Sequence, residues 1–172
     1  VTHIEMDPFF VYHNGNGFEE DGKLFVDYVR HETFTLGDAL HTDFSGLYRL
    51  ELDLKTNHYV HHLLFDKRIE FPRINEAFIG KPYRYLYAPL KTQGHIRAFH
   101  ALLQFDLKTR KAYTHDFGED KEIDEAVFIP KPSKTKANEL EGWLGLFVYD
   151  RTTDISEFVL LDAKRFTAKP VT

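Results

Sequence analysis

The sequence contains no cysteine. Disulfide bonds, thiolate metal sites and a cysteine nucleophile are therefore excluded. Any metal ion that this chain helps to bind must be held by histidine, aspartate or glutamate side chains.

Long apolar runs and clusters of positive charge are also missing. No apolar stretch approaches the roughly 20 residues that a membrane-spanning helix needs. The formal charge of −5 and the pI near 6.1 include no basic stripe, so a nucleic-acid partner is not expected. The first residues, VTHIEMDPFF, lack the basic start and apolar core of a signal peptide. We expect a cytoplasmic protein without a transmembrane segment.

The residue patterns of common hydrolases and nucleotide-binding enzymes are missing too. Serine is scarce, G-x-S-x-G does not occur, and there is no glycine-rich loop for phosphate. The acidic pairs Glu19-Glu20 and Glu119-Asp120 fall in expected turns, where solvated side chains are the simpler interpretation. We assign no catalytic residue.

Aromatic residues are plentiful, with 16 Phe and 9 Tyr, and the apolar runs are short. This pattern predicts an all-β fold. The segment LYRLELDLKTNHYVHHLLF is echoed by AFHALLQFDLKTRKAYTHDF and more faintly by GWLGLFVYDRTTDISEFVLL. The central Asp53, Asp106 and Asp150 are 53 and 44 residues apart, which is typical of β-propeller blades.

We expect about three four-stranded blades within a single partial propeller domain, residues 1–172. The first takes in residues 9–29 and 47–65, the second residues 70–117, and the third residues 125–171. We expect EFPRI at Glu70 and EAVFI at Glu125 to be the short innermost strands of the second and third blades. Residues 35–45 and 130–141 are predicted to be excursions between strands. We expect DLKT to form a turn in which Asp and Thr bond their own backbone. Three blades do not close a propeller, so we also predict exposed edges and self-association.

One stretch stands out, FFVYHNGNGFEEDGKLFVDYVRH at residues 9–31, which predicts strand, turn and strand. His13 ends the first apolar run and is followed by a glycine-rich backbone. A strand histidine in this position can be a metal ligand, although packed or surface histidines are more common.

This pattern resembles the carotenoid cleavage oxygenases, a family that includes the lignostilbene dioxygenases. The blocks that carry the resemblance are F-x-x-x-H-x-x-N-G-F-E-E-D-G, EFPRIN from Glu70, EAVFIP from Glu125, and GWLGLFVYD, in the family's order. The resemblance covers nearly the whole chain but half or less of a typical member. It implies the C-terminal blades of a seven-bladed propeller.

The resemblance also implies a site. Members hold a non-haem iron(II) on the propeller axis with four histidines, and glutamates accept the outward N–H of three of them. His13 matches one ligand, and Glu70 and Glu125 match two of the supporting glutamates. The resemblance implies that a carboxylate oxygen of Glu70 lies about 2.6–3.2 Å from a ring nitrogen of His13, and that Glu125 reaches the same space without a histidine partner. The upstream blades, with two ligands and a glutamate, and the final histidine-containing segment have no match in this chain. One imidazole cannot chelate, so the 172 residues alone are not expected to hold iron tightly or to be active.

The other histidines suggest no second site. His58 and His62 share a face of one predicted strand but lie about 13 Å apart along it. We expect these two and His61 to face solvent. His95, His100 and His115 have no partner spacing and are expected to be structural.

Two functions remain open. One is part of an Fe²⁺ dioxygenase that cleaves a C=C bond of a carotenoid, apocarotenoid or stilbene into two carbonyl products, with the hydrophobic alkene and dioxygen as its substrates. The other is a non-catalytic binding or structural fragment derived from a propeller, which self-associates or pairs with the missing half. If the reading frame encodes two more histidines upstream of this sequence and a His-Gly downstream of it, the dioxygenase function is favoured.

Overall fold

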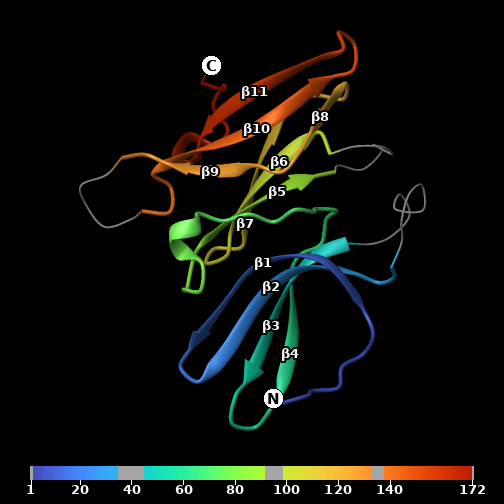
Figure 1. Cartoon of the computed structure of the whole chain (residues 1–172), viewed down its shortest axis with the longest axis vertical. Coiled ribbons are helices and arrows are strands. Elements are labelled where there is room, and N and C mark those ends of the chain that lie inside the picture. The colour runs from blue at the N-terminus through green and yellow to red at the C-terminus, as the bar shows by residue number, and fades with distance from the viewer. Residues whose placement is uncertain (1, 35–44, 92–98, 133–137, 172) are drawn as a thin grey trace.

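The computed structural model describes residues 2–34, 45–91, 99–132 and 138–171. The described residues form three antiparallel sheets that follow one another along the chain (Figure 1). This arrangement confirms the predicted all-β fold with an open array of sheets. His95 and most of the excursion expected at residues 35–45 lie outside the described residues, as does the middle of the one expected at 130–141.

The first sheet has four strands in chain order. They are β1 (Phe10–Glu20), β2 (Lys23–His31), β3 (Ser45–Asp53) and β4 (Tyr59–Phe65). The β1–β2 hairpin closes through Asp21 and Gly22, which both have positive φ, at 51° and 76°. Asp and Gly tolerate this conformation, which two-residue hairpin turns require.

The second sheet has three strands, β5 (Tyr85–Leu90), β6 (Ala101–Asp106) and β7 (Lys111–Asp116). The expected fourth strand at EFPRI is wrong: this segment makes only two isolated bridges to β5, Ile69 with Leu90 and Arg73 with Tyr87. Between the bridges Phe71 has a positive φ of 50° and Pro72 has no N–H to donate, so a regular ladder cannot form. A short 3₁₀ helix, η2 (Glu76–Phe78), follows.

The third sheet contains β8 (Lys121–Ile123), β9 (Val127–Pro130), β10 (Gly142–Asp150) and β11 (Ile155–Asp162), and the 3₁₀ helix η3 (Ala163–Arg165) comes next. Both β8 and β9 pair with β10, at its opposite ends. They are two halves of one inner strand that is interrupted at residues 124–126. The third sheet therefore starts at Lys121, four residues before the predicted start.

The turn prediction is confirmed at all three repeats. The carboxylate of Asp53 accepts hydrogen bonds from the backbone N–H groups of Lys55 and Thr56, each at 2.9 Å. Asp106 and Asp150 make the equivalent bonds two and three residues ahead. The repeated DLKT motif and its variant DRTT therefore form Asp-centred turns.

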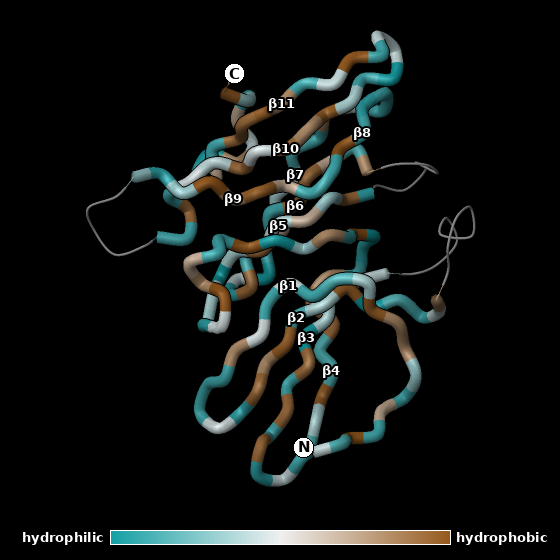
Figure 2. The backbone as a smooth tube through the Cα atoms, in the orientation of Figure 1, coloured by the Kyte–Doolittle hydropathy of each residue, from teal (hydrophilic) through white to brown (hydrophobic). Residues whose placement is uncertain are grey.

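The sheets pack face to face through two apolar clusters. Val29 and Leu47 of the first sheet pack with Leu86, Leu103 and Phe105 of the second. On its other face the second sheet contributes Tyr87 and Leu102, which pack with residues of the third, among them Phe128, Leu144 and Leu146. Figure 2 shows the brown apolar positions recurring along these strands. The second sheet is thus buried on both faces.

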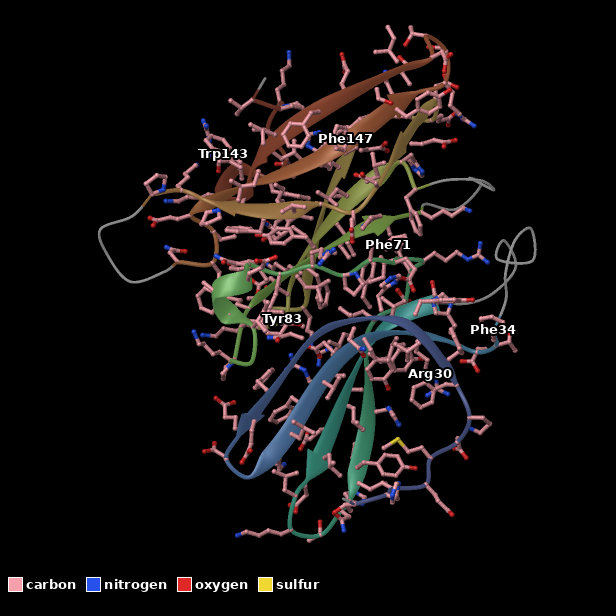
Figure 3. All side chains as sticks on the ribbon, viewed as in Figure 1. Arg30, Phe34, Phe71, Tyr83, Trp143 and Phe147 are labelled. Carbon is pink, nitrogen blue, oxygen red and sulfur yellow. The ribbon has the colours of Figure 1, made fainter. Side chains whose placement is uncertain are left out.

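The outer face of the third sheet lacks a covering sheet among the described residues. Val127, Phe147 and Phe158 are 51%, 57% and 53% exposed. Figure 3 labels Phe147 and Trp143 on this part of the molecule. Among the described segments, no helix is long and apolar enough to cross a membrane.

Candidate metal-ligand site

His13 lies at an irregularity of β1. Val11 pairs with Arg30, but the next pair joins Asn14 to Tyr28, so two residues of β1 stand opposite one of β2. Such a bulge turns a side chain out of the regular alternation and is common beside functional sites. The side chain of His13 is 45% exposed.

Glu70 lies in the interrupted segment beside β5. Its backbone N–H donates to the carbonyl of Pro89 at 3.3 Å, and its carboxylate accepts the backbone N–H of Phe71 at 2.7 Å. The aromatic ring of Phe71 lies 4.6 Å from the imidazole of His13, centroid to centroid. Figure 3 shows Phe71 between the first sheet and the upper part of the molecule.

The predicted contact between His13 and Glu70 is confirmed. The Nδ1 atom of His13 lies 2.7 Å from Oε2 of Glu70, whose side chain is only 11% exposed. An ionised carboxylate can only accept, so His13 donates from Nδ1, and in its neutral form it has a lone pair on Nε2. A carboxylate on one ring nitrogen fixes the tautomer and raises the basicity of the other, which suits a metal ligand.

The sequence did not point to a second histidine on the same carboxylate. Nε2 of His31 lies 2.8 Å from Oε1 of Glu70, and the side chain of His31 is 6% exposed. The available signal was the hairpin register: counting back from the turn at Asp21 and Gly22 places His31 opposite Tyr12, the neighbour of His13, and two register shifts in β1 then pair it with Phe10.

Glu125 occupies the break between β8 and β9. It accepts two hydrogen bonds from Arg73, at 3.0 Å from Nε and 2.7 Å from Nη2. Its side chain is 41% exposed. We expected Glu125 to have no histidine partner here; the arginine partner was not foreseen.

A pocket of about 150 Å³ connects these irregular segments. Its lining includes Asn14, Gly15, Pro72, Arg73, Val127 and Phe128. The residues that follow His13, the residues that follow Glu70 and the residues that follow Glu125 thus border one space. The three predicted site residues lie in or beside three different sheets, and their chain neighbours border the same pocket.

Asn16, three residues after His13, has a structural role. Its side-chain amide donates to the carbonyls of Phe78 and Lys81, each at 3.2 Å, and its oxygen accepts the N–H of Gly80 at 3.1 Å. These bonds tie β1 to the loop after η2. The asparagine of the motif therefore holds β1 and that loop together.

A buried ionic network supports the same junction. The fully buried carboxylate of Asp27 accepts two hydrogen bonds from Arg49, each at 2.7 Å, and one from the hydroxyl of Tyr83 at 2.5 Å. Burial, reinforced by the nearby Asp27 carboxylate, raises the pKa of Tyr83 well above its ordinary value. Tyr83 therefore stays neutral and donates.

The remaining histidines have other partners. His58 faces solvent as predicted, but it precedes β4 instead of lying on it. His61 is only partly exposed, so the prediction that it faces solvent is wrong. The hydroxyl of Tyr28, whose pKa burial raises to about 12, is hydrogen-bonded to Nδ1 of His61, and the His61 ring packs against Phe9. His62 pairs with Glu51, and His115 lies 3.1 Å from the carbonyl of Phe166.

The described residues fit only part of a metal site. His13 has the outward lone pair and Glu70 the supporting carboxylate. Within the described ranges, no three histidine, aspartate or glutamate side chains lie close enough together to hold a metal. The described residues therefore offer one candidate ligand, His13, and no chelating set around it.

Comparisons with known proteins identify similar sequences and structures. A family model described as retinal pigment epithelial membrane protein (RPE65) matches residues 1–172. The chain is 30% identical over 191 residues to carotenoid 9,10(9',10')-cleavage dioxygenase 1 of Pisum sativum and 29% identical over 181 residues to apocarotenoid-15,15'-oxygenase of Synechocystis. Both alignments cover 99% of this chain but only 35% and 36% of the relatives.

The solved structure of cobalt-substituted Synechocystis ACO matches with a TM-score of 0.85 and 27% identity. The match covers 94% of this chain and 35% of that one. The chain therefore spans about a third of the length of the relatives it resembles. The cobalt substitution indicates a metal site in that neighbour.

Proposed function

Since the chain belongs to the RPE65 family, which includes the carotenoid cleavage oxygenases, we propose that it forms part of a non-haem iron(II) dioxygenase. The reaction would cleave a C=C double bond of a carotenoid, apocarotenoid or stilbene and give two carbonyl products. The observation that carries the proposal is the hydrogen bond from His13 to the nearly buried Glu70.

In this proposal His13 holds the metal through Nε2. Glu70 keeps the proton on Nδ1 and directs the ring, and Phe71 limits its rotation by packing against it. Glu125 supports a histidine from outside the described residues. When bound, the iron would supply dioxygen activation.

The substrate must be largely apolar, because its reacting group is an alkene. The relatives named above act on carotenoids or apocarotenoids, and stilbenes remain part of the proposal through the sequence resemblance. The partner that completes the site would be the remainder of a propeller.

A test follows from the shared site. We expect the protein in which this chain is joined to the remaining blades to bind iron and cleave an apocarotenoid or stilbene, detected as two carbonyl products by mass spectrometry. The 172 residues alone should give no cleavage. Cleavage by the 172 residues alone would mean that another histidine completes a site.

A second candidate is a non-catalytic binding or structural fragment. The exposed apolar face formed by Val127, Phe147 and Phe158 favours association. If the joined protein binds iron with its histidines intact yet cleaves no member of an alkene panel, this second candidate is the better account.

A further inference from the structure

Glu70 accepts three hydrogen bonds in a region that is almost closed to solvent. Oε2 accepts from His13 Nδ1 at 2.7 Å and from the backbone N–H of Phe71 at 2.7 Å, and Oε1 accepts from His31 Nε2 at 2.8 Å. The two oxygens therefore have different partners. His13 and Phe71 donate to one of them, and His31 donates to the other.

His31 is fixed by regular structure. As the last residue of β2 it pairs with Phe10 of β1 and with Ser45 of β3. Its ring meets the ring of Tyr12 edge to face, with centroids 4.9 Å apart. The hydroxyl of Ser45 also donates to the carbonyl of Ile69, at 3.3 Å, so β3 holds the segment that carries Glu70.

We propose that His31 is a positioning residue for the metal ligand His13, acting through Glu70. A glutamate side chain has several rotatable bonds and loses considerable rotamer freedom when it is ordered. By holding Oε1, His31 fixes the rotation of the carboxylate and directs Oε2 at Nδ1 of His13. The link to metal binding rests on the proposed function; the link to the tautomer of His13 does not.

The proposal differs from a purely structural role for His31. A packing residue would affect the stability of the junction and leave the proton on His13 where it is. A positioning residue must change the tautomer of His13 when its bond to Glu70 is removed. The tautomer can be measured without any metal.

The experiment uses the 172-residue chain labelled with ¹⁵N-histidine, at mildly alkaline pH where ordinary imidazoles are neutral. Long-range ¹H–¹⁵N correlation spectra identify the protonated ring nitrogen. We expect His13 to be the Nδ1–H tautomer in the unmodified chain. In His31→Phe it should move toward the Nε2–H tautomer, and in His31→Gln, whose amide N–H can replace the ring Nε2–H, it should return.

Two further variants complete the test. His31→Asn keeps a polar side chain but its amide stops short of Glu70, so it should behave like His31→Phe and can replace that variant if Phe prevents folding. His62→Phe removes a comparable pair, Nε2 of His62 with Glu51 at 3.1 Å, from the same sheet and should leave His13 unchanged. An unchanged Nδ1–H tautomer in folded His31→Phe or His31→Asn would overturn the proposal.

Metal binding adds an independent readout. In the protein joined to its remaining blades, His31→Phe or His31→Asn should lower Co²⁺ or Fe²⁺ affinity about tenfold, the lower end of the range for supporting residues, and His31→Gln should largely restore it. If the tautomer responds as expected but the joined protein binds no metal at all, the proposed function fails and the positioning role of His31 stands.

Discussion

Glu70 and His13 are 57 residues apart in the sequence, and their side chains are joined by a 2.7 Å hydrogen bond between Oε2 and Nδ1. The bond links a bulge of the first sheet to the irregular segment beside the second. No local element holds the two residues together. Their meeting therefore depends on the packing of the two sheets.

Replacing Glu70 by glutamine tests the carboxylate with little change in size. The amide places a donor where His13, His31 and Phe71 all donate, so one of these bonds must be lost. We expect metal affinity in the joined protein to fall 10–100-fold, with a smaller effect on unfolding. Metal titration and urea denaturation check the two parts. Loss of folding with unchanged metal affinity in the folded fraction would contradict the assigned role.

Acid stability should depend on Asp106. Two hydrogen bonds from the Arg84 guanidinium, at 2.9 and 2.6 Å, hold the pKa of Asp106 well below its ordinary value. A carboxyl whose pKa is lowered by folding stabilises the protein above its unfolded pKa of about 3.9, and that stability is lost as the pH falls toward the folded pKa.

In Asp106→Asn this contribution is absent. The free energy of unfolding, from urea denaturation, should therefore be lower than that of the unmodified chain near neutral pH and should fall less steeply below about pH 4. Arg84→Met should flatten the curve in the same way. Parallel pH curves for the unmodified chain and both variants would contradict the assignment.

Gly142 is the first residue of β10 and lies close to Phe128 and Ile129 of β9. A Cβ atom there would lie 2.3 Å from Cζ of Phe128 and 2.8 Å from the backbone oxygen of Ile129, so Gly142→Ala should destabilise the chain by about 1–3 kcal/mol. At Gly17 the nearest atom, the oxygen of Phe25, would be 3.5 Å away. Gly17→Ala should change the unfolding free energy by about 0.5 kcal/mol or less. Equal effects in denaturant unfolding would show that the packing at Gly142 is not as described.

The outer face of the third sheet should cause self-association of the 172 residues. Phe147 and Phe158 form an exposed aromatic pair with centroids 5.2 Å apart. Sedimentation velocity should show oligomers at micromolar concentration, and the double variant Phe147→Glu with Phe158→Glu should shift them toward monomer. Leu54→Glu, a similar change in an exposed turn, should not. A well-behaved monomer at high micromolar concentration would refute this prediction.

Regular features of the fold could be predicted from the sequence because they depend on local chemistry. The Asp-centred turns at Asp53, Asp106 and Asp150 are fixed by bonds to residues two and three ahead, and their spacing indicated three sheets. The inner segment at Glu70 was wrongly predicted as a strand. Its neighbours Phe71 and Pro72 interrupt the hydrogen-bond ladder. The strand was predicted from the repeat and the resemblance to a family motif, although a proline cannot donate to a ladder.

The site was only partly predictable. The His13–Glu70 pair followed from a motif resemblance, whereas His31 lies at a strand end without a motif and reaches Glu70 only through the register of the first sheet. The bond between Arg73 and Glu125 joins two long, half-exposed side chains 52 residues apart. Such pairs form only when the two sheets are in their final positions, and no local sequence pattern determines those positions.

The central claim, that His13 is a metal ligand, is tested most directly by iron binding in the protein joined to its remaining blades. Iron content and affinity are compared for the unmodified protein, His13→Ala and the control His62→Ala, with folding verified by circular dichroism. The account predicts that His13→Ala loses iron while His62→Ala retains it. Equal iron content and affinity in folded His13→Ala and in the unmodified protein would contradict it.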